Sequence, residues 1–264
     1  MTATPPAGGV PVTVVIAAHN EGDQIEACVR SVSWAAEVLV VENDSTDDTV
    51  ARAVGAGATV FSHPFQSIGA QRNAAIARAS QPWVLVLDAD ERASAAFGEE
   101  VRRRIGESGV EAYRVPRRNW FLGREIQHSG WNRDRPVRLF RNHLRYDERP
   151  VHEHVLTQEV PGLLREALLH RPYANLGEYF EKLGRYSRDW ARQNLEMGRH
   201  ASFLHLVFRP QARFLSTFFL RGGWRDGGHG LVISLLAGVS VASKYAHLWA
   251  LQHERNGAED PWQR

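Results

Sequence analysis

The sequence predicts an α/β fold with a doubly wound, mostly parallel sheet and a C-terminal α-helical extension. In the first ~90 residues, short apolar runs rich in Val and Ile alternate with helical patterns. Short loops connect these segments, as expected for parallel strands that are joined by helices. After Asn175 the alternation stops, and apolar residues recur only at helical spacing. This change in pattern predicts an α/β part followed by helices.

Four strands, the first and the fourth expected to be buried, and the helices between them account for the first part of the chain. The strands are expected at Val12–Ala17, Glu37–Glu42, Ala58–Ser62 and Trp83–Leu87. Three helices are expected between these strands. Apolar residues at helical spacing predict the first from Ile25 to Ser33, N-cap residues precede the second, which ends near Val54, and the third covers Ser67–Ala79.

The rest of the chain is less regular until the helical extension begins. A helix is expected at Phe97–Ile105, and strands at Ala112–Val115, Val137–Phe140 and Leu163–His170. Later helices are expected from Leu176, over Phe203–Leu220 and over Gly230–Gln252. The predicted organisation is a flexible tail (1–11), an α/β domain (12–174, with a first half 12–92 and a second half 93–174) and a helical region (175–264).

Composition narrows the class of protein without naming it. The formal net charge is +2 over 264 residues, so nothing in the balance indicates a nucleic-acid partner. The charge is uneven, because residues 161–264 carry 14 Arg or Lys against 9 Asp or Glu. Cys28 is the sole cysteine, which excludes an intramolecular disulfide and fits a cytoplasmic location. Residues 1–11 lack the charged start and apolar centre of a signal peptide.

Two carboxylates follow the fourth predicted strand, at the end where open α/β sheets bind ligands. Asp88 and Asp90 are separated by one residue, so their side chains are expected on the same side of the chain. Two oxygen ligands aimed at one point suit a divalent cation, which can neutralise phosphate oxygens. A solvated turn would be the better explanation of the pair if it stood alone.

Further acidic residues follow the earlier strands. Glu21 comes after the first strand, and Glu42 and Asp44 come at the end of the second. These side chains should converge with Asp88 at one crevice, where a cation or hydrogen-bond donors would offset their repulsion. Arg72, near the start of a predicted helix, could hold a phosphate there.

At this point the chain resembles a known family. The segments VVIAAHNE, VVENDSTDDT, GAQRNAAIARA and VLVLDADE are similar to the nucleotide-sugar half of the family 2 glycosyltransferases, which have the GT-A fold. The second motif departs from the family, because Glu42-Asn43-Asp44 replaces a common pair of aspartates. WNRDRPVRLF, PVHEH and HRPYANL resemble, more narrowly, bacterial lipopolysaccharide-core β-1,4-glucosyltransferases.

The resemblance implies that residues 12–174 are a catalytic domain, with a nucleotide-sugar half at 12–92 and an acceptor half at 93–174. Asp90 would ligate Mg²⁺ or Mn²⁺, and Asp88 would contact the ribose or donor sugar and help to position the metal. Arg72 would approach the diphosphate. The remaining contacts would be made to the base and ribose, by Ala18, Asn20, Glu21 and either Glu42 or Asp44.

The implied reaction is a metal-dependent displacement at the anomeric carbon with inversion, which needs a general base. Glu153, flanked by His152 and His154, is the expected base, and Asp134 is its rival. Other expected contacts, with acceptor or diphosphate, are made by Trp131, Arg138 and His152. A solvated strand face is the alternative interpretation of Arg138.

The resemblance also suggests partners and a location. The donor would be UDP-glucose, and the acceptor a glycolipid of the lipopolysaccharide inner core. A polyprenyl-phosphate or another polysaccharide precursor, and a non-catalytic nucleotide-sugar binder, are alternatives. A nucleotidyltransferase is disfavoured because Val14–Gly22 lacks a Gly-rich basic loop.

The C-terminal region is expected to lie at the inner face of the cytoplasmic membrane. Leu231–Ser243 is an uncharged run of 13 residues, short of the ~20 needed to span a bilayer. Nearby Arg, Trp and Tyr residues instead favour helices at the interface. The alternatives are a helical hairpin packed on the catalytic domain and a dimer contact. Truncation near Ala201 is therefore expected to make the protein more soluble.

Overall fold

The computed structural model describes residues 8–147 and 153–255, and the chain divides into two compact units. The first unit contains Met1–Arg118 and Arg133–Arg171, and the second contains Asn119–Asn132 and Pro172–Arg264. The sequence-based division at residue 174 therefore differs in one respect. The segment 119–132 groups with the C-terminal helices rather than with the sheet that surrounds it in the sequence.

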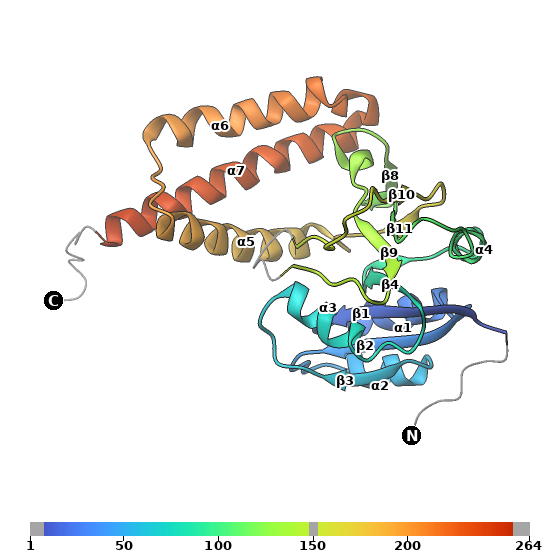
Figure 1. Cartoon of the computed structure of the whole chain (residues 1–264). Helices are drawn as coiled ribbons and strands as arrows, with labels where there is room; N and C mark the ends of the chain where they lie inside the picture. Colours follow the sequence, from blue (N-terminus) through green and yellow to red (C-terminus); the bar gives the residue numbers. More distant parts are fainter. Residues whose placement is uncertain (1–7, 148–152, 256–264) are drawn as a thin grey trace. The chain divides into compact units, whose positions relative to one another are not determined.

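A seven-stranded sheet forms the centre of the first unit, in the order β10-β6-β9-β4-β1-β2-β3. Figure 1 labels six of these strands: β1, β2, β3, β4, β9 and β10. Neighbouring strands among β1 to β4 pair in parallel, whereas β9 is antiparallel to both β4 and β6. The predicted mostly parallel sheet is thus confirmed. The strands are β1 (Val10–Ala18), β2 (Ala35–Glu42), β3 (Thr59–Ser62), β4 (Trp83–Asp88), β6 (Ala112–Arg114), β9 (Val137–Arg141) and β10 (Gly162–Leu163).

Both faces of the central strands are buried, as their continuous apolar runs predict. Along β1, Val14 and Ile16 belong to one buried cluster and Val15 belongs to another. Ser67 caps a helix, because its hydroxyl accepts a hydrogen bond from the Ala70 amide. The helices of this unit are α1 (Gly22–Ser31), α2 (Thr49–Gly55), α3 (Ile68–Ile76) and α4 (Ala95–Arg104).

Two sequence-based expectations at the edges of this unit are wrong. The strand expected at Leu163–His170 is two strands, β10 and β11 (Leu168–His170), and β11 pairs with β5 (Glu91–Arg92). The break occurs because the buried Glu100 carboxylate accepts hydrogen bonds from the amides of the turn between them. The tail expected at 1–11 is shorter, since β1 begins at Val10; residues 1–7 lie outside the described part.

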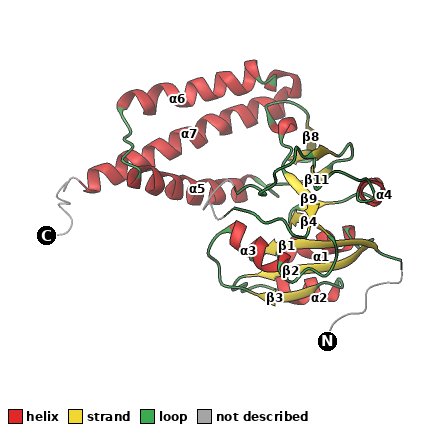
Figure 2. Ribbon diagram, viewed as in Figure 1, coloured by secondary structure: helices red, strands yellow, loops and turns green. Residues whose placement is uncertain are grey.

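The second unit consists of long helices and the end of a β-hairpin (Figure 2). Its helices are α5 (Leu176–Glu196), α6 (Phe203–Leu215), which continues into a π-helical turn at Ser216–Leu220, and α7 (Gly227–Arg255). Helix α7 packs against both α5 and α6. The hairpin is formed by β7 (Arg117–Phe121) and β8 (Arg124–Ile126). Phe121 and Ile126 are buried together with Ile233 of α7.

One helix of the described residues is long and apolar enough to cross a membrane, by length and composition alone. It covers Gly223–Glu254, with a mean hydropathy of 1.5. The expectation that this region is too short to span was based on an uncharged run of 13 residues, but α7 continues past Lys244 to Arg255. Helix α7 packs against α5 and α6, but only 22% of its most apolar window is buried, whereas the core helix of a soluble protein is mostly buried.

Candidate active site

The site lies at the carboxyl ends of three adjacent strands of the sheet. Strand β1 stands between β2 and β4, and Ala18 is in register with Glu42 while Ala17 is in register with Asp88. The strand order turns back between β1 and β4. Open α/β sheets bind ligands at such a switch point. The sequence therefore places its acidic residues at the edge where a ligand is expected.

The loops after β1 and β2 are held together by their own polar side chains. Asn20 and Asp44 both have positive φ angles, of 55° and 49°. The Asn20 side-chain oxygen accepts a hydrogen bond from the Thr46 amide at 2.8 Å, and Glu42 accepts one from the Ser45 amide at 3.0 Å. Glu42 is buried and braces this loop, whereas Asp44 is exposed. Of the two candidates for the base contact, Asp44 is the accessible one.

The start of α1 is tied to the same loop. The Glu21 amide donates to the Thr49 hydroxyl at 2.8 Å, and the Gly22 amide donates to the Asp47 carboxylate at 2.9 Å. Asp47 also accepts from the Thr49 amide, as its position before a helix predicts. Ala18, Asn20 and Glu21, at the end of β1 and just after it, are thus joined to Glu42 and Asp44, at the end of β2 and just after it.

Three guanidinium groups surround Asp88. Its Oδ1 accepts a hydrogen bond from Arg72 Nη2 at 2.5 Å, and its Oδ2 accepts from Arg138 Nη2 at 2.6 Å and Arg117 Nη2 at 3.1 Å. Burial disfavours the charged form of this carboxyl, but the three cations outweigh burial and hold the pKa of Asp88 well below its usual range. The same contact raises the pKa of Arg138 despite its burial. Asp88 is therefore an anion that organises three arginines.

The two candidate bases are held by the same arginines. Arg72 Nη1 donates to Glu153 Oε1, and Arg117 Nη1 donates to Asp134 Oδ2 at 2.9 Å. Glu153 and Asp134 both line a cavity of about 1090 Å³ within the first unit. The side chain of Glu153 is 18% exposed and that of Asp134 is 50% exposed. Glu153 is thus the better sheltered of the two carboxylates.

Asp90 provides the oxygen best suited to a metal ion. Its Oδ1 is buried without a hydrogen-bond partner, and its Oδ2 lies 3.4 Å from His170 Nε2. Both oxygens of Asp88, by contrast, already accept from guanidinium groups. No group of three or more His, Cys, Asp or Glu suited to a metal occurs in the described residues. Asp90 therefore fits a cation that takes its other ligands from water and phosphates, as Mg²⁺ commonly does.

A further buried carboxyl, that of Glu91, contacts both Asp88 and Arg117. Glu91 Oε2 accepts a hydrogen bond from the Asp88 amide at 2.9 Å, and Glu91 Oε1 lies 2.6 Å from Arg117 Nε. Burial and the neighbouring charge of Asp88 raise the pKa of Glu91. Sequence reasoning missed both Glu91 and Arg117. Nothing distinguished Arg117 within an arginine-rich stretch, and a Glu after the strand looked like an ordinary loop residue.

The remaining expected residues differ in where they lie. Arg138 is buried and bonded to Asp88, so its interpretation as a solvated strand face is wrong. Trp131 belongs to the second unit and does not line the cavity around Glu153. His152 lies outside the described residues. His170, quoted only as part of a longer motif, is the unexpected neighbour of Asp90.

Sheet topology and the carboxylates at the switch point define the GT-A class of nucleotide-sugar-dependent transferases. The chain belongs to Glycosyl transferase family 2, whose profile matches residues 13–170. It is 30% identical over 239 residues to the lipopolysaccharide core biosynthesis glycosyltransferase LpsC of Rhizobium meliloti, covering 87% of this chain and 88% of that protein.

Two other relatives are more distant. An uncharacterized glycosyltransferase of Rickettsia conorii is 26% identical over 243 residues, with 85% of each chain covered. The chain is also similar to a crystal structure of glucosyl-3-phosphoglycerate synthase from Mycobacterium tuberculosis in complex with Mn²⁺, uridine diphosphate and phosphoglyceric acid. The sequence identity is 26%, and the match covers 40% of this chain and 43% of that one. Its TM-score is 0.37, a likeness too low to bear on the fold or the site.

Proposed function

We propose that this glycosyltransferase is a metal-dependent, inverting hexosyltransferase that moves glucose from UDP-glucose to a glycolipid of the lipopolysaccharide inner core. The observation that supports it best is the pair of neighbouring carboxylates at the switch point. Both carboxylate oxygens of Asp88 accept hydrogen bonds from arginines, whereas Asp90 has a buried oxygen without a hydrogen-bond partner. The similarity to LpsC along most of the chain supports the assignment of the acceptor.

In this proposal the two loops bind the nucleotide and the arginines bind the diphosphate. Asp44 contacts the base, and Asn20 and Glu21 form the ribose side of the site with Ala18. Arg72 approaches the diphosphate from the middle of α3. Asp90 ligates Mg²⁺ or Mn²⁺, which would neutralise charge on the leaving diphosphate. Asp88 contributes by fixing the guanidinium groups rather than by direct ligation, because both its oxygens are occupied.

Glu153 is the proposed general base. It would accept the proton of the acceptor hydroxyl as that oxygen attacks the anomeric carbon on the face opposite the leaving group, which inverts the configuration. Its contact with Arg72 fixes the carboxylate beside the group that would bind the diphosphate. A base that is positioned in this way contributes about 10²–10⁴-fold in rate. Asp134 can reach the same cavity and is the alternative.

The second unit supports peripheral contact with the inner face of the cytoplasmic membrane. Exposed apolar side chains recur along its helices at helical spacing, and each is at least 42% exposed. Such a surface, flanked by arginines, is typical of helices that lie in the membrane interface. The exposed residues are Leu204, Phe208, Leu215 and Phe219 on α6 and its π-turn, and Leu231, Leu235 and Val239 on α7.

The test is binding and hydrolysis of donors by the purified full-length protein. UDP-glucose should bind more tightly with Mg²⁺ or Mn²⁺ than with EDTA, and slow release of UDP should accompany binding. Asp90→Asn should abolish the metal dependence and lower turnover at least about 100-fold, while Asp23→Asn, an exposed carboxylate on α1, should change neither. Metal-independent binding, or full turnover by Asp90→Asn, would overturn the proposal.

A further inference from the structure

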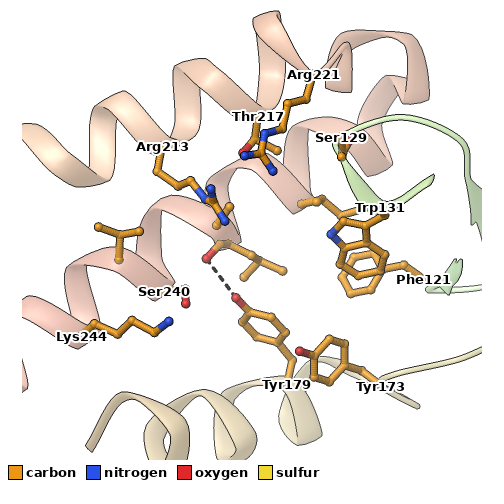
Figure 3. Close-up of a pocket in the computed structure, with 15 residues that line it drawn as sticks. Phe121, Ser129, Trp131, Tyr173, Tyr179, Arg213, Thr217, Arg221, Ser240 and Lys244 are labelled. Carbon is orange, nitrogen blue, oxygen red and sulfur yellow. Dashed lines mark hydrogen bonds between the residues drawn. The ribbon is translucent and has the colours of Figure 1, made fainter. Parts of the chain in front are cut away.

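The second unit contains a cavity of its own, of about 300 Å³. Its lining residues come from the segment 119–132, from residues 173 and 179, and from the helices α6 and α7 with the turn between them (Figure 3). None of them lines the cavity around Glu153. A volume of this size suits a ligand such as a monosaccharide with one attached group.

Three cationic side chains extend into this cavity. Figure 3 shows Arg213 of α6, Arg221 after the π-helical turn, and Lys244 of α7 directed toward the same space. No carboxylate of the described residues forms an ion pair with any of them. Burial and the charge of Arg221 lower the pKa of Arg213, and burial and the charge of Arg213 lower the pKa of Lys244. An anion in the cavity would relieve this repulsion.

The position of Arg221 is fixed by close packing. Its side chain lies against Gly130, where a Cβ atom would come within 2.8 Å of Arg221 Nη1. The Arg221 carbonyl also accepts a hydrogen bond from the Ser129 amide at 3.0 Å. The preceding π-helical turn at Ser216–Leu220 carries Thr217, which also lines the cavity. Such turns occur often at functional sites because they redirect side chains within a helix.

Aromatic rings form the opposite side of the cavity. Trp131 packs edge-on against Phe121 at 5.7 Å, and Tyr173 packs edge-on against Tyr179 at 4.9 Å. The Tyr179 hydroxyl donates to the Leu236 carbonyl at 2.9 Å, so this ring is anchored to α7 (Figure 3). Aromatic faces pack against the apolar faces of sugar rings, and guanidinium pairs bind phosphate oxygens bidentately.

We propose that this cavity binds a phosphorylated saccharide, with its phosphate on Arg213, Arg221 and Lys244 and its sugar ring against Trp131 and Tyr173. As a binding site it stands on the geometry of the second unit alone. As the site for a phosphorylated part of the acceptor it rests on the proposed function. An uncharged acceptor would leave the repulsion among the three cations uncompensated, whereas a sugar phosphate would contact both the cationic and the aromatic side of the cavity.

The experiment is calorimetric titration of the full-length protein with glucose 6-phosphate, inorganic phosphate and glucose. Glucose 6-phosphate should bind most tightly. The variants Arg213→Gln and Arg221→Gln should each weaken its binding about tenfold or more. Arg209→Gln on the same helix, whose guanidinium lies over the Tyr245 ring at 5.2 Å, should have no effect. Trp131→Leu should weaken glucose 6-phosphate but not inorganic phosphate, with thermal melting to confirm folding.

The outcomes separate this proposal from others. If glucose 6-phosphate fails to bind at millimolar concentration, or binds equally to Arg213→Gln and Arg221→Gln, the proposal is wrong. If vesicles of phosphatidylglycerol displace it and require the same arginines, the cavity binds a lipid headgroup and the saccharide assignment fails. UDP binding with Mn²⁺ should be unchanged in these variants. Loss of UDP binding is expected only in Asp90→Asn, where it tests the donor site. The two proposals can therefore fail independently.

Discussion

Arg72 and Glu153 are 81 positions apart in the chain and form an ion pair at the carboxyl end of the sheet. The same guanidinium also binds Asp88. One arginine in the middle of α3 therefore fixes both the carboxylate at the end of β4 and the candidate base. Any change at Arg72 should disturb donor binding and proton transfer together, so the two roles are better separated by changing the carboxylates.

Replacing Glu153 by Gln tests the assignment of the base. The amide can still accept a hydrogen bond from Arg72 but cannot take up a proton, so kcat should fall about 10²–10⁴-fold while the Kd for UDP-glucose changes little. Steady-state kinetics and calorimetry measure the two effects. Asp134→Asn, on the exposed side of the same cavity, is the matched variant. If it lowers kcat more than Glu153→Gln does, Asp134 is the base.

Arg138→Met should destabilise the first unit through the charge that it leaves behind. Removing one partner of a fully buried pair costs roughly 3–5 kcal/mol. The cost here should be smaller, about 2 kcal/mol, because Asp88 is one-third exposed and keeps Arg72 and Arg117. Urea unfolding measures the difference. Arg141→Met on the same strand, where the guanidinium only stacks on Trp83 at 4.4 Å, should cost about 1 kcal/mol or less.

The same pair predicts a dependence on pH. Because the folded-state pKa of Asp88 is lowered, its stabilising contribution is fully present above the unfolded value of 3.8 and is lost as the pH falls below it. Unfolding measured from neutral to acid pH should show the Arg138→Met difference shrinking only in that acid range. A difference that disappears already near pH 6 would contradict a lowered pKa.

Cys28 should be unreactive in the folded protein. It is fully buried on α1, and burial raises the pKa of its thiol well above the usual range, so little thiolate forms at neutral pH. A colourimetric thiol reagent at pH 8 should label almost none of the native protein and one thiol per chain in guanidinium. Rapid labelling of native protein would show that α1 opens readily.

The apolar surface of α6 should determine attachment to membranes. Exchanging Leu204 and Phe208, both 62% exposed, for Ser should reduce co-sedimentation with anionic vesicles without lowering the melting temperature. The control is the exposed pair Val50 and Val54 on α2, which has the same spacing. Unchanged binding of the α6 variant, or no binding by the wild type even at low salt, would rule out the interfacial role.

Local patterns predicted the centre of the sheet well because its central strands are short, continuous apolar runs with both faces buried. The ends of β1, β2 and β4 were therefore located closely enough to place Ala18, Glu42 and Asp88 on one edge. Residues of the site that come from later in the chain were harder to assign. Arg138 was expected there, but Arg117 lies in β7, which leaves no periodic pattern in the sequence, and His170 reaches the site through the pairing of β11 with β5.

The break between β10 and β11 shows a second limit of sequence reasoning. Leu163–His170 looks like one apolar strand, but the carboxylate of Glu100, from α4, captures the amides of Arg165 and Glu166. This long-range contact overrides local propensity. The assignment of residues 119–132 to the second unit has the same origin, because it depends on burial of Phe121 and Ile126 against α7.

That hairpin also changes what shortening the chain would do. Asp226, before α7, accepts hydrogen bonds from the Gln127 and His128 amides and from the Ser129 hydroxyl. Ending the chain near Ala201 would remove this anchor together with Ile233, and Phe121 and Ile126 would face water. The shortened protein should aggregate rather than gain solubility, contrary to the expectation from sequence. The helices after Ala201 therefore form one packed unit with the segment 119–132, and removing them would expose apolar residues of that segment.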